Sequence, residues 1–302
     1  MRVERHGRIV VARHEHPDAL LTVDVLRELR VLLTELEQDP EVRVFVMTGS
    51  APGSYMIALD PAQGVEMSSR IPPVPAGLAA PVVRGLARWM RRIPALAKML
   101  DWTPPLRGAY LDQLLIFDIL EHSSLVTIAA ISGDCFGGGL ELSLGFDFRF
   151  VADDPDIVIA QPEILAGLVP GFGATERLAK VLGPAKALEV MLLAEPMSPQ
   201  EAERAGLVHR VIEGDFDSGV LEIAERLANR SPVAVGGIKR AMQHGDELFE
   251  VLRAWRSTDT QRGLAAFRGM LDGQRAMSKD KRRPSRELLA KLDAGLVQWG
   301  QV

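Results

Sequence analysis

The sequence predicts an α/β protein, because short apolar runs typical of strands alternate with longer segments of helical periodicity. The most apolar of these runs are almost unbroken, as expected of strands that are covered on both faces. The chain has 302 residues, of which 47% are apolar and 25% are charged. These fractions match globular averages and exclude intrinsic disorder and fibrous repeats, while the length fits one large domain or a domain with an appendage.

The first part of the chain reads as strand, helix, strand. Residues 8–12 form a short β-branched run. Thr22 is placed to cap a helix that begins at Val23, because apolar residues recur at helical spacing after it. Residues 42–47 form the second strand, which ends at a loop rich in glycine and proline over residues 48–53.

The sequence pattern changes over residues 62–122, where strand-like runs are absent. The prolines between residues 71 and 77 exclude a helix or a central strand there, whereas residues 83–100 and 106–120 have helical patterns. Because the segment has no strand pattern, we interpret it as a helical insertion or lid over a site. A surface helical hairpin without a role is an equal alternative.

The third part returns to strand–helix alternation, with three strand-like runs at residues 125–131, 146–151 and 157–160. A glycine-rich turn after the first run leads into a short helix. Helices then follow from Ala174 to the end, and Ser198 begins a capping box. We therefore divide the chain into a core over residues 1–230 and a C-terminal helical region over residues 231–302.

Composition excludes several classes of function. A net charge of −5 offers no positive footprint for a nucleic acid or an anionic membrane. No run reaches the ~18 apolar residues of a membrane helix, and the first residues show no secretory h-region, so we expect a cytoplasmic protein. The single cysteine, Cys135, rules out an intramolecular disulfide and reads as a small buried residue rather than a nucleophile. We expect His14 and His16 to be exposed, without a third ligand for a metal.

Three consecutive glycines, Gly137, Gly138 and Gly139, stand between a predicted strand and a predicted helix. Without Cβ atoms the backbone approaches a ligand closely, and its N–H groups at a helix N-terminus suit a developing oxyanion. The spacing is neither a dinucleotide fingerprint nor a Walker loop. On the glycines alone, a flexible turn is an equal alternative.

Two glutamates are candidates for acid–base chemistry. Glu141 lies in the first turn of the helix after the glycines, where the helix dipole stabilises a carboxylate in any case. Glu163 follows Pro162 and precedes a run of apolar and glycine residues. Apolar surroundings raise the pKa of a carboxyl group, which suits a proton donor near neutral pH. Taken alone, each residue is more typical of a helix start or an exposed loop.

Further motifs occur in a fixed order along the chain, at residues 129–133, 137–142, 160–163, 167–171, 175–178 and 202–208, with Asp147 and Lys239 between and after them. Together they resemble the crotonase (enoyl-CoA hydratase/isomerase) superfamily. The resemblance covers most of the chain outside residues 62–122 and the tail after Phe267. It is specific for the superfamily and much less so for the reaction.

The resemblance implies a core of ββα units arranged in a spiral, closed by C-terminal helices that pack against neighbours in a homotrimer or a dimer of trimers. It also implies an enoyl-CoA hydratase, which adds water across the double bond of a 2-enoyl-CoA. In that reaction the Gly138 N–H binds the thioester oxygen, Glu141 is the base on a water molecule, and Glu163 delivers a proton to Cα. The implied partner is an acyl-CoA thioester, with no metal and no cofactor beyond the coenzyme A of the substrate.

The same resemblance places the second oxyanion donor in residues 55–60. Leu59 supplies this N–H if Asp60 aligns with the family's aspartate, whereas a shifted register selects Ala58, which stands where the family has a glycine. The implied CoA-binding positions are Ala19, Ala58, Asp60 and Gly137. The lysine that often follows the aspartate is missing, and the candidates to compensate for it are Arg84, Arg88, Arg91 and Arg92.

Two rival functions stay open on the sequence. An enoyl-CoA isomerase needs only the carboxylate at Glu163, and other crotonase chemistries share the oxyanion hole. A non-catalytic oligomeric scaffold or RNA binder is slightly favoured by the altered CoA loops and opposed by the presence of both glutamates. The basic run over residues 279–283 reads as a solvated face and adds little to that alternative.

Overall fold

The computed structural model describes residues 1–69 and 105–275, together with residues 77, 78, 81, 82, 85, 89, 290, 293 and 294. The predicted helix over residues 83–100 lies almost entirely outside the described residues. The four arginines proposed to compensate for the missing lysine and the basic run over residues 279–283 lie outside them as well. For this part of the chain, the lid over the site stays a prediction.

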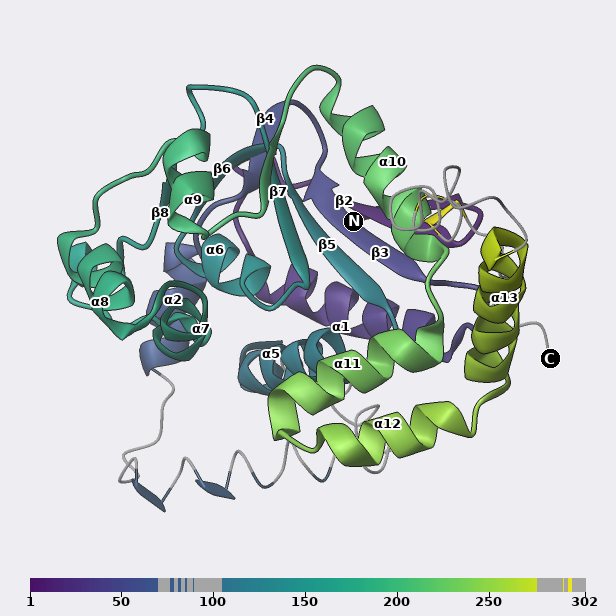
Figure 1. Ribbon diagram of the computed structural model, residues 1–302. Coiled ribbons are helices and arrows are strands. Elements are labelled where there is room, and N and C mark those ends of the chain that lie inside the picture. Colours follow the sequence, from purple (N-terminus) through teal and green to yellow (C-terminus); the bar gives the residue numbers. More distant parts are fainter. Residues whose placement is uncertain are drawn as a thin grey trace.

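Six strands form the main sheet in the order β1-β2-β3-β5-β7-β9 (Figure 1). Their bounds are β1 Arg2–His6, β2 Ile9–His14, β3 Val44–Gly49, β5 Val126–Ile131, β7 Phe148–Ala152 and β9 Arg210–Ile212. The β1–β2 pair is antiparallel, and every other neighbouring pair is parallel. The predicted strands β2, β3, β5 and β7 are confirmed to within a few residues. The sequence pattern misses β1, which is mostly exposed, and β9, which is only three residues long.

Three short parallel strands form a second sheet in the order β4 (Gly53–Met56), β6 (Gly133–Phe136) and β8 (Ile159–Ala160). Each follows a strand of the main sheet and leads towards a helical segment, namely α2 Pro61–Ser69, α6 Gly138–Ser143 and the 3₁₀ helix η2 Glu163–Ala166. This repeated strand–strand–helix order is the ββα arrangement that the resemblance implies, and it confirms the predicted fold class.

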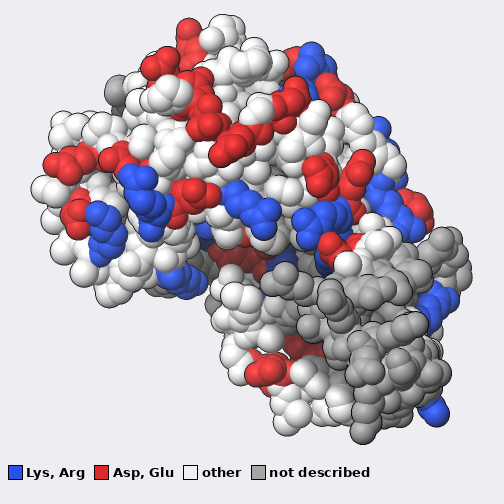
Figure 2. Space-filling view, turned by 45° about the horizontal axis from the view of Figure 1, so that its top comes forward, with Lys and Arg blue, Asp and Glu red and all other residues white. Residues whose placement is uncertain are grey.

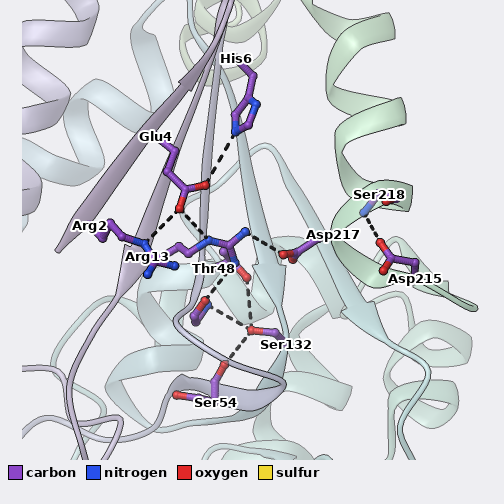
Figure 3. A network of polar contacts seen from close by, with 11 residues as sticks. Arg2, Glu4, His6, Arg13, Thr48, Ser54, Ser132, Asp215, Asp217 and Ser218 are labelled. Atoms are coloured by element: carbon purple, nitrogen blue, oxygen red, sulfur yellow. Dashed lines mark hydrogen bonds and ion pairs between the residues drawn. The ribbon is translucent and has the colours of Figure 1, made fainter.

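A polar cluster joins the two sheets where the chain passes from one to the other (Figure 3). The Ser132 hydroxyl donates to the Ser54 carbonyl oxygen at 2.6 Å and accepts from the Gly49 N–H at 3.1 Å. A Cβ at Gly133 would lie 2.2 Å from the Gly53 carbonyl carbon, so the backbones touch and no side chain fits. These contacts fix the start of β4 and β6, and hence the position of the loops that follow them.

Helices α1 (Val23–Gln38) and α5 (Pro105–His122) pack together and contribute to the apolar cluster on one face of the main sheet. The Thr22 side chain accepts from the Val25 N–H and caps α1 as predicted. The buried Arg30–Asp112 ion pair joins the two helices, and Ile116 is fully buried. The end of the segment over residues 62–122 is therefore core, not insertion or surface hairpin, because its apolar stripe is covered.

Helix α10 (Phe216–Ala228) covers the opposite face of the main sheet. Its buried residues Val220 and Ala224 form a second apolar cluster with strand residues that include Val11. Arg13 of β2 forms an ion pair with Asp217 in the first turn of α10, at 2.7 Å (Figure 3). Both faces of the parallel strands are thus covered, which explains their unbroken apolar runs.

The remaining helices are α7 Ala174–Leu182, α8 Pro184–Leu193, α9 Pro199–Ala205, α11 Pro232–His244, α12 Glu247–Trp255 and α13 Thr258–Arg275. The capping box of α9 between Ser198 and Glu201 is confirmed. Helix α11 is anchored to the core of its own chain, because Lys239 Nζ lies 2.9 Å from Asp147 Oδ2. Large apolar side chains of α11 and α12 are exposed to solvent in the single chain: Ile238, Met242, Leu248, Phe249 and Trp255.

The surface carries both signs of charge. On the face shown in Figure 2, acidic side chains gather towards the top. Acidic and uncharged residues interrupt the basic side chains across the middle, so the described residues on that face form no continuous positive surface. Among the residues with a described structure, none of the helices has the length and apolar character needed to cross a lipid bilayer.

Candidate active site

The glycine turn between β6 and α6 packs against the loop that follows β4. The Gly139 N–H donates to the Ile57 carbonyl oxygen at 2.8 Å, and a Cβ at Gly139 would lie 1.9 Å from the Met56 carbonyl oxygen. Gly137 has φ +54°, a backbone conformation that residues other than glycine rarely adopt. The glycines are therefore required by close contact and backbone geometry, which argues against the flexible turn.

Three backbone N–H groups, those of Gly138, Leu59 and Ala58, have no acceptor among the described residues where these loops meet. A Cβ at Gly138 would lie 3.2 Å from the Leu59 nitrogen, so the two peptides are neighbours. Gly138 is buried and Leu59 is half-buried, and buried backbone donors left unpaired are rare unless a ligand or water accepts from them. The N–H groups of Gly138 and Leu59 form a pair that is suited to bind an oxygen that carries negative charge.

Glu141 is held in the interior by the start of α7. Its side chain is 2% exposed, and its Oε1 accepts from the Phe172 N–H at 2.8 Å and from the Ala174 N–H at 3.1 Å. Burial is the largest cause that raises the pKa of Glu141, the two N–H donors lower it and the charge of Glu163 raises it, and the net pKa is about 7. The residue thus titrates near neutral pH.

Glu163 lies over the glycine turn, at the first position of η2. A Cβ at Gly137 would lie 3.2 Å from Glu163 Oε1. Its Oε2 accepts from Gln161 Nε2 at 2.8 Å, and Gln161 is itself buried. Partial burial raises the pKa of Glu163 above its usual range, as the apolar surroundings in the sequence predict.

A cavity of about 330 Å³ brings these groups together. It is lined by Leu26, Ala58, Leu59, Gln113, Gly138, Glu141, Glu163, Leu168, Val169, Gly171 and Phe172. The structure therefore places both predicted catalytic glutamates and both predicted oxyanion donors around one space. Gln113 is the polar lining residue that sequence reasoning missed. Its only signal is an amide among the apolar positions of the helix predicted over residues 106–120.

The predicted CoA-binding positions cluster at the loops beside this cavity. Ala19 has φ 51°, and its carbonyl oxygen accepts from the Ile57 N–H at 2.9 Å. Asp60 Oδ1 accepts from the Ala62 N–H at 2.9 Å, at the start of α2, and Asp60 itself donates through its N–H to the Leu21 carbonyl oxygen. Hydrogen bonds from residues 19–21 thus hold the loop that carries Ala58 and Leu59.

His14 contradicts the expectation of an exposed residue, since only 1% of it is accessible. Its Nε2 lies 3.0 Å from the Leu20 carbonyl oxygen, and His16 Nδ1 accepts from the Leu20 N–H at 3.3 Å. Both imidazoles hydrogen-bond to the loop after β2; His14 is buried there, whereas His16 is half-exposed. Within the described ranges, no group of three or more His, Cys, Asp or Glu residues is placed to hold a metal ion.

Cys135 is fully buried in β6, as predicted. Burial raises the pKa of its thiol to about 12, so the sulfur is protonated and unreactive at neutral pH.

Comparison with known proteins decides the family. The profile described as enoyl-CoA hydratase/isomerase matches residues 111–265, just over half of the chain. The chain belongs to the enoyl-CoA hydratase/isomerase family. Within this family, it is 38% identical over 278 residues to a probable enoyl-CoA hydratase of Rhizobium meliloti, a match that covers 88% of this chain and 93% of that protein.

Two further similar proteins are an isomerase and a hydratase of known structure. The chain is 27% identical over 242 residues to a peroxisomal Delta(3,5)-Delta(2,4)-dienoyl-CoA isomerase of Arabidopsis thaliana, covering 80% of this chain and 78% of that one. It shares the fold of an enoyl-CoA hydratase from Bacillus anthracis with a TM-score of 0.69 at 24% identity, over 89% of this chain and 96% of the other. The resemblance drawn from the sequence is thus confirmed at the level of family and fold.

Proposed function

We propose that this family member is an enoyl-CoA hydratase, which adds water across the double bond of a 2-enoyl-CoA to give a 3-hydroxyacyl-CoA. The observation that carries the proposal is the presence of Glu141 and Glu163 around one cavity with the unpaired N–H groups of Gly138 and Leu59. An isomerase needs one carboxylate and no water, so a second buried carboxylate at this place favours hydration.

In the proposed reaction, the thioester oxygen accepts from the Gly138 and Leu59 N–H groups. A water molecule lies between the two carboxyl groups. Glu141 takes a proton from it while its oxygen bonds to Cβ, and the π electrons of the double bond move onto the thioester oxygen as an enolate. Glu163 then gives its proton to Cα. No metal or redox group is needed, because the proton taken and the proton given balance and the N–H pair stabilises the enolate.

The pair of carboxyl groups works with one proton between them. The charge of ionised Glu163 raises the pKa of Glu141, so Glu141 releases the last proton of the pair as the pH rises, at about 7. Coupled groups titrate as a unit, and the proton count of the pair sets the working pH range. The resting pair thus holds its proton on Glu141, and this proton passes through the water between the two groups to Glu163 before Glu141 acts as the base.

The proposed reaction also suggests where the substrate binds. We place the thioester end of the substrate at Gly138 and the coenzyme A moiety along Ala19, Ala58, Asp60 and Gly137, whose loops are held together by hydrogen bonds. The exposed apolar side chains on α11 and α12 support a homotrimer or a dimer of trimers. A single buried cysteine, with no partner for a disulfide, suits the reducing cytoplasm.

A panel of thioesters tests the proposal. Wild-type protein is incubated with crotonyl-CoA and with a 3-enoyl-CoA, and products are identified by mass spectrometry. We expect crotonyl-CoA to gain one water and Glu163→Gln to slow this by about 10²–10⁴-fold, because general acid catalysis is lost. The matched control Glu195→Gln, at an exposed site after α8, should react at the wild-type rate.

Double-bond migration without water addition would replace the hydratase with an isomerase. No conversion, together with no thermal stabilisation by saturating acetoacetyl-CoA, would favour a non-catalytic scaffold, since a ligand at 100 times its Kd stabilises a fold by about 2.7 kcal/mol.

A further inference from the structure

Gln113 of α5 is a buried amide that the proposed reaction does not use. It is 5% exposed and lines the same cavity as Glu141 and Glu163. Its Nε2 donates to the Gly171 carbonyl oxygen at 3.2 Å. Burying an amide costs free energy unless its hydrogen bonds are made, so this contact gives the buried Gln113 a defined partner.

The Gly171 carbonyl belongs to the peptide unit that also contains the Phe172 N–H. That N–H donates to Glu141 Oε1 at 2.8 Å. A trans peptide is planar and its C=O and N–H groups point in opposite directions, so a donor that fixes the C=O also fixes the direction of the N–H. A hydrogen bond at the C=O also polarises the unit and strengthens its N–H as a donor. Gln113 and Glu141 therefore hold opposite ends of one peptide.

Helix α5 supports the rest of this loop as well. Arg177 Nε donates to Glu121 Oε1 of α5 at 2.9 Å. A Cβ at Gly173 would lie 2.1 Å from Arg177 Nη1, so the guanidinium packs directly against the loop. The next N–H, that of Ala174, is the second donor to Glu141. Both donors to the carboxylate are thus supported from the same helix, and Gln113 is the support that binds the loop backbone directly.

We propose that Gln113 is a positioning residue for Glu141: it orients the peptide between Gly171 and Phe172, and this peptide directs the Glu141 carboxylate within the cavity. The catalytic role of the oriented carboxylate rests on the proposed hydratase function. The contacts from Gln113 through this peptide to Glu141 do not depend on that function. The substitution that tests the positioning role is Gln113→Leu, which has a similar volume and cannot donate. Gln113→Met is a second variant, because it has a similar size, adds no charge to the cavity and cannot donate a hydrogen bond.

In both variants the Phe172 N–H loses its fixed direction, and the ionised form of Glu141 loses stabilisation. We expect the pKa of Glu141 to rise by about 0.5–1 unit. The ¹³C resonances of side-chain-labelled glutamate report this pKa directly, with Glu141 assigned by its loss in Glu141→Gln. In steady-state kinetics on crotonyl-CoA, we expect kcat to fall about 10-fold with KM within about twofold, and the pH limb near 7 to move to higher pH.

The matched control is Thr34→Val, which removes a hydroxyl-to-carbonyl hydrogen bond on α1 (to Arg30, 2.8 Å) without touching the loop. It should leave the Glu141 titration and the kinetics unchanged. A raised Glu141 pKa in a protein that does not hydrate crotonyl-CoA supports the positioning role and overturns the proposed function. An unchanged Glu141 pKa and an unchanged pH limb in whichever Gln113 variant folds, with hydration intact, overturns the positioning role.

Discussion

The burial of Glu141 lowers the stability of the fold and raises the pKa of its carboxyl group. Its carboxyl group is almost fully buried, and two backbone N–H groups hold it but do not offset the loss of water around its charge. A glutamate in the first turn of a helix is ordinary in sequence. Here α6 directs it under the loop before α7 and not towards solvent, which raises its pKa and suits the acid–base role that we propose.

The substitution Glu141→Gln should therefore stabilise the fold at alkaline pH. The raised pKa means that the folded state prefers the protonated form, so wild-type stability is full below pH ~4 and declines as the pH rises through about 7. The amide keeps an oxygen that accepts from Phe172 and Ala174 and carries no charge. We expect a gain of about 2–3 kcal/mol in the free energy of unfolding at pH ~9, measured by urea denaturation.

The gain should vanish below pH ~4, where the wild-type carboxyl group is protonated in both the folded and the unfolded state. The exposed control Glu195→Gln should show no comparable difference at either pH. An equal effect of Glu141→Gln at both pH values would mean that the carboxyl group does not titrate in the folded state as described.

At the scale of elements, the contact between the β6–α6 turn and the loop after β4 builds the pair of N–H donors. Gly139 has no space for a side chain, since its Cβ would meet two backbone carbonyl oxygens, those of Met56 and Ile57. A tight backbone contact of this kind sets the distance between Gly138 and Leu59. The same contact therefore serves both stability and the proposed chemistry.

Gly139→Ala should push these two loops apart. Overpacking against backbone costs about 1–3 kcal/mol, and a displaced donor loses about 10²–10³ in rate. Thermal unfolding and crotonyl-CoA hydration measure the two effects. Gly64→Ala in α2 is the control, because a Cβ there meets nothing within 4 Å and should leave both values within the range of a surface change. Wild-type stability and rate in Gly139→Ala would show that the close contact is absent.

The same scale explains which elements the sequence could predict. The helix after Thr22, the long parallel strands and the capping box at Ser198 carry local patterns that their burial and caps enforce. Strand β6 has only four residues and contains Gly133 and Asp134, so its pairing depends on neighbours far along the chain. Helix α5 has a helical pattern, but only packing against α1 shows that it belongs to the core.

For the whole molecule, the fold class and the two glutamates could be predicted because family motifs mark them at fixed places in the sequence. The site as a cavity could not, because its walls come from segments far apart: Leu26 on α1, Gln113 on α5 and Phe172 before α7. The burial of His14 was also beyond local reasoning, since a histidine at the end of a strand is covered or exposed according to the loop folded over it.

Glu141 and Glu163 come from separate ββα units and line one cavity, and the mechanism that we propose requires them to hold one proton between them. The pH dependence of kcat/KM for crotonyl-CoA hydration tests it most directly. We predict a bell-shaped profile whose alkaline limb has its midpoint at about pH 7, where Glu141 gives up the last proton of the pair. A profile that stays level from about pH 6 to about pH 9 would contradict the shared proton.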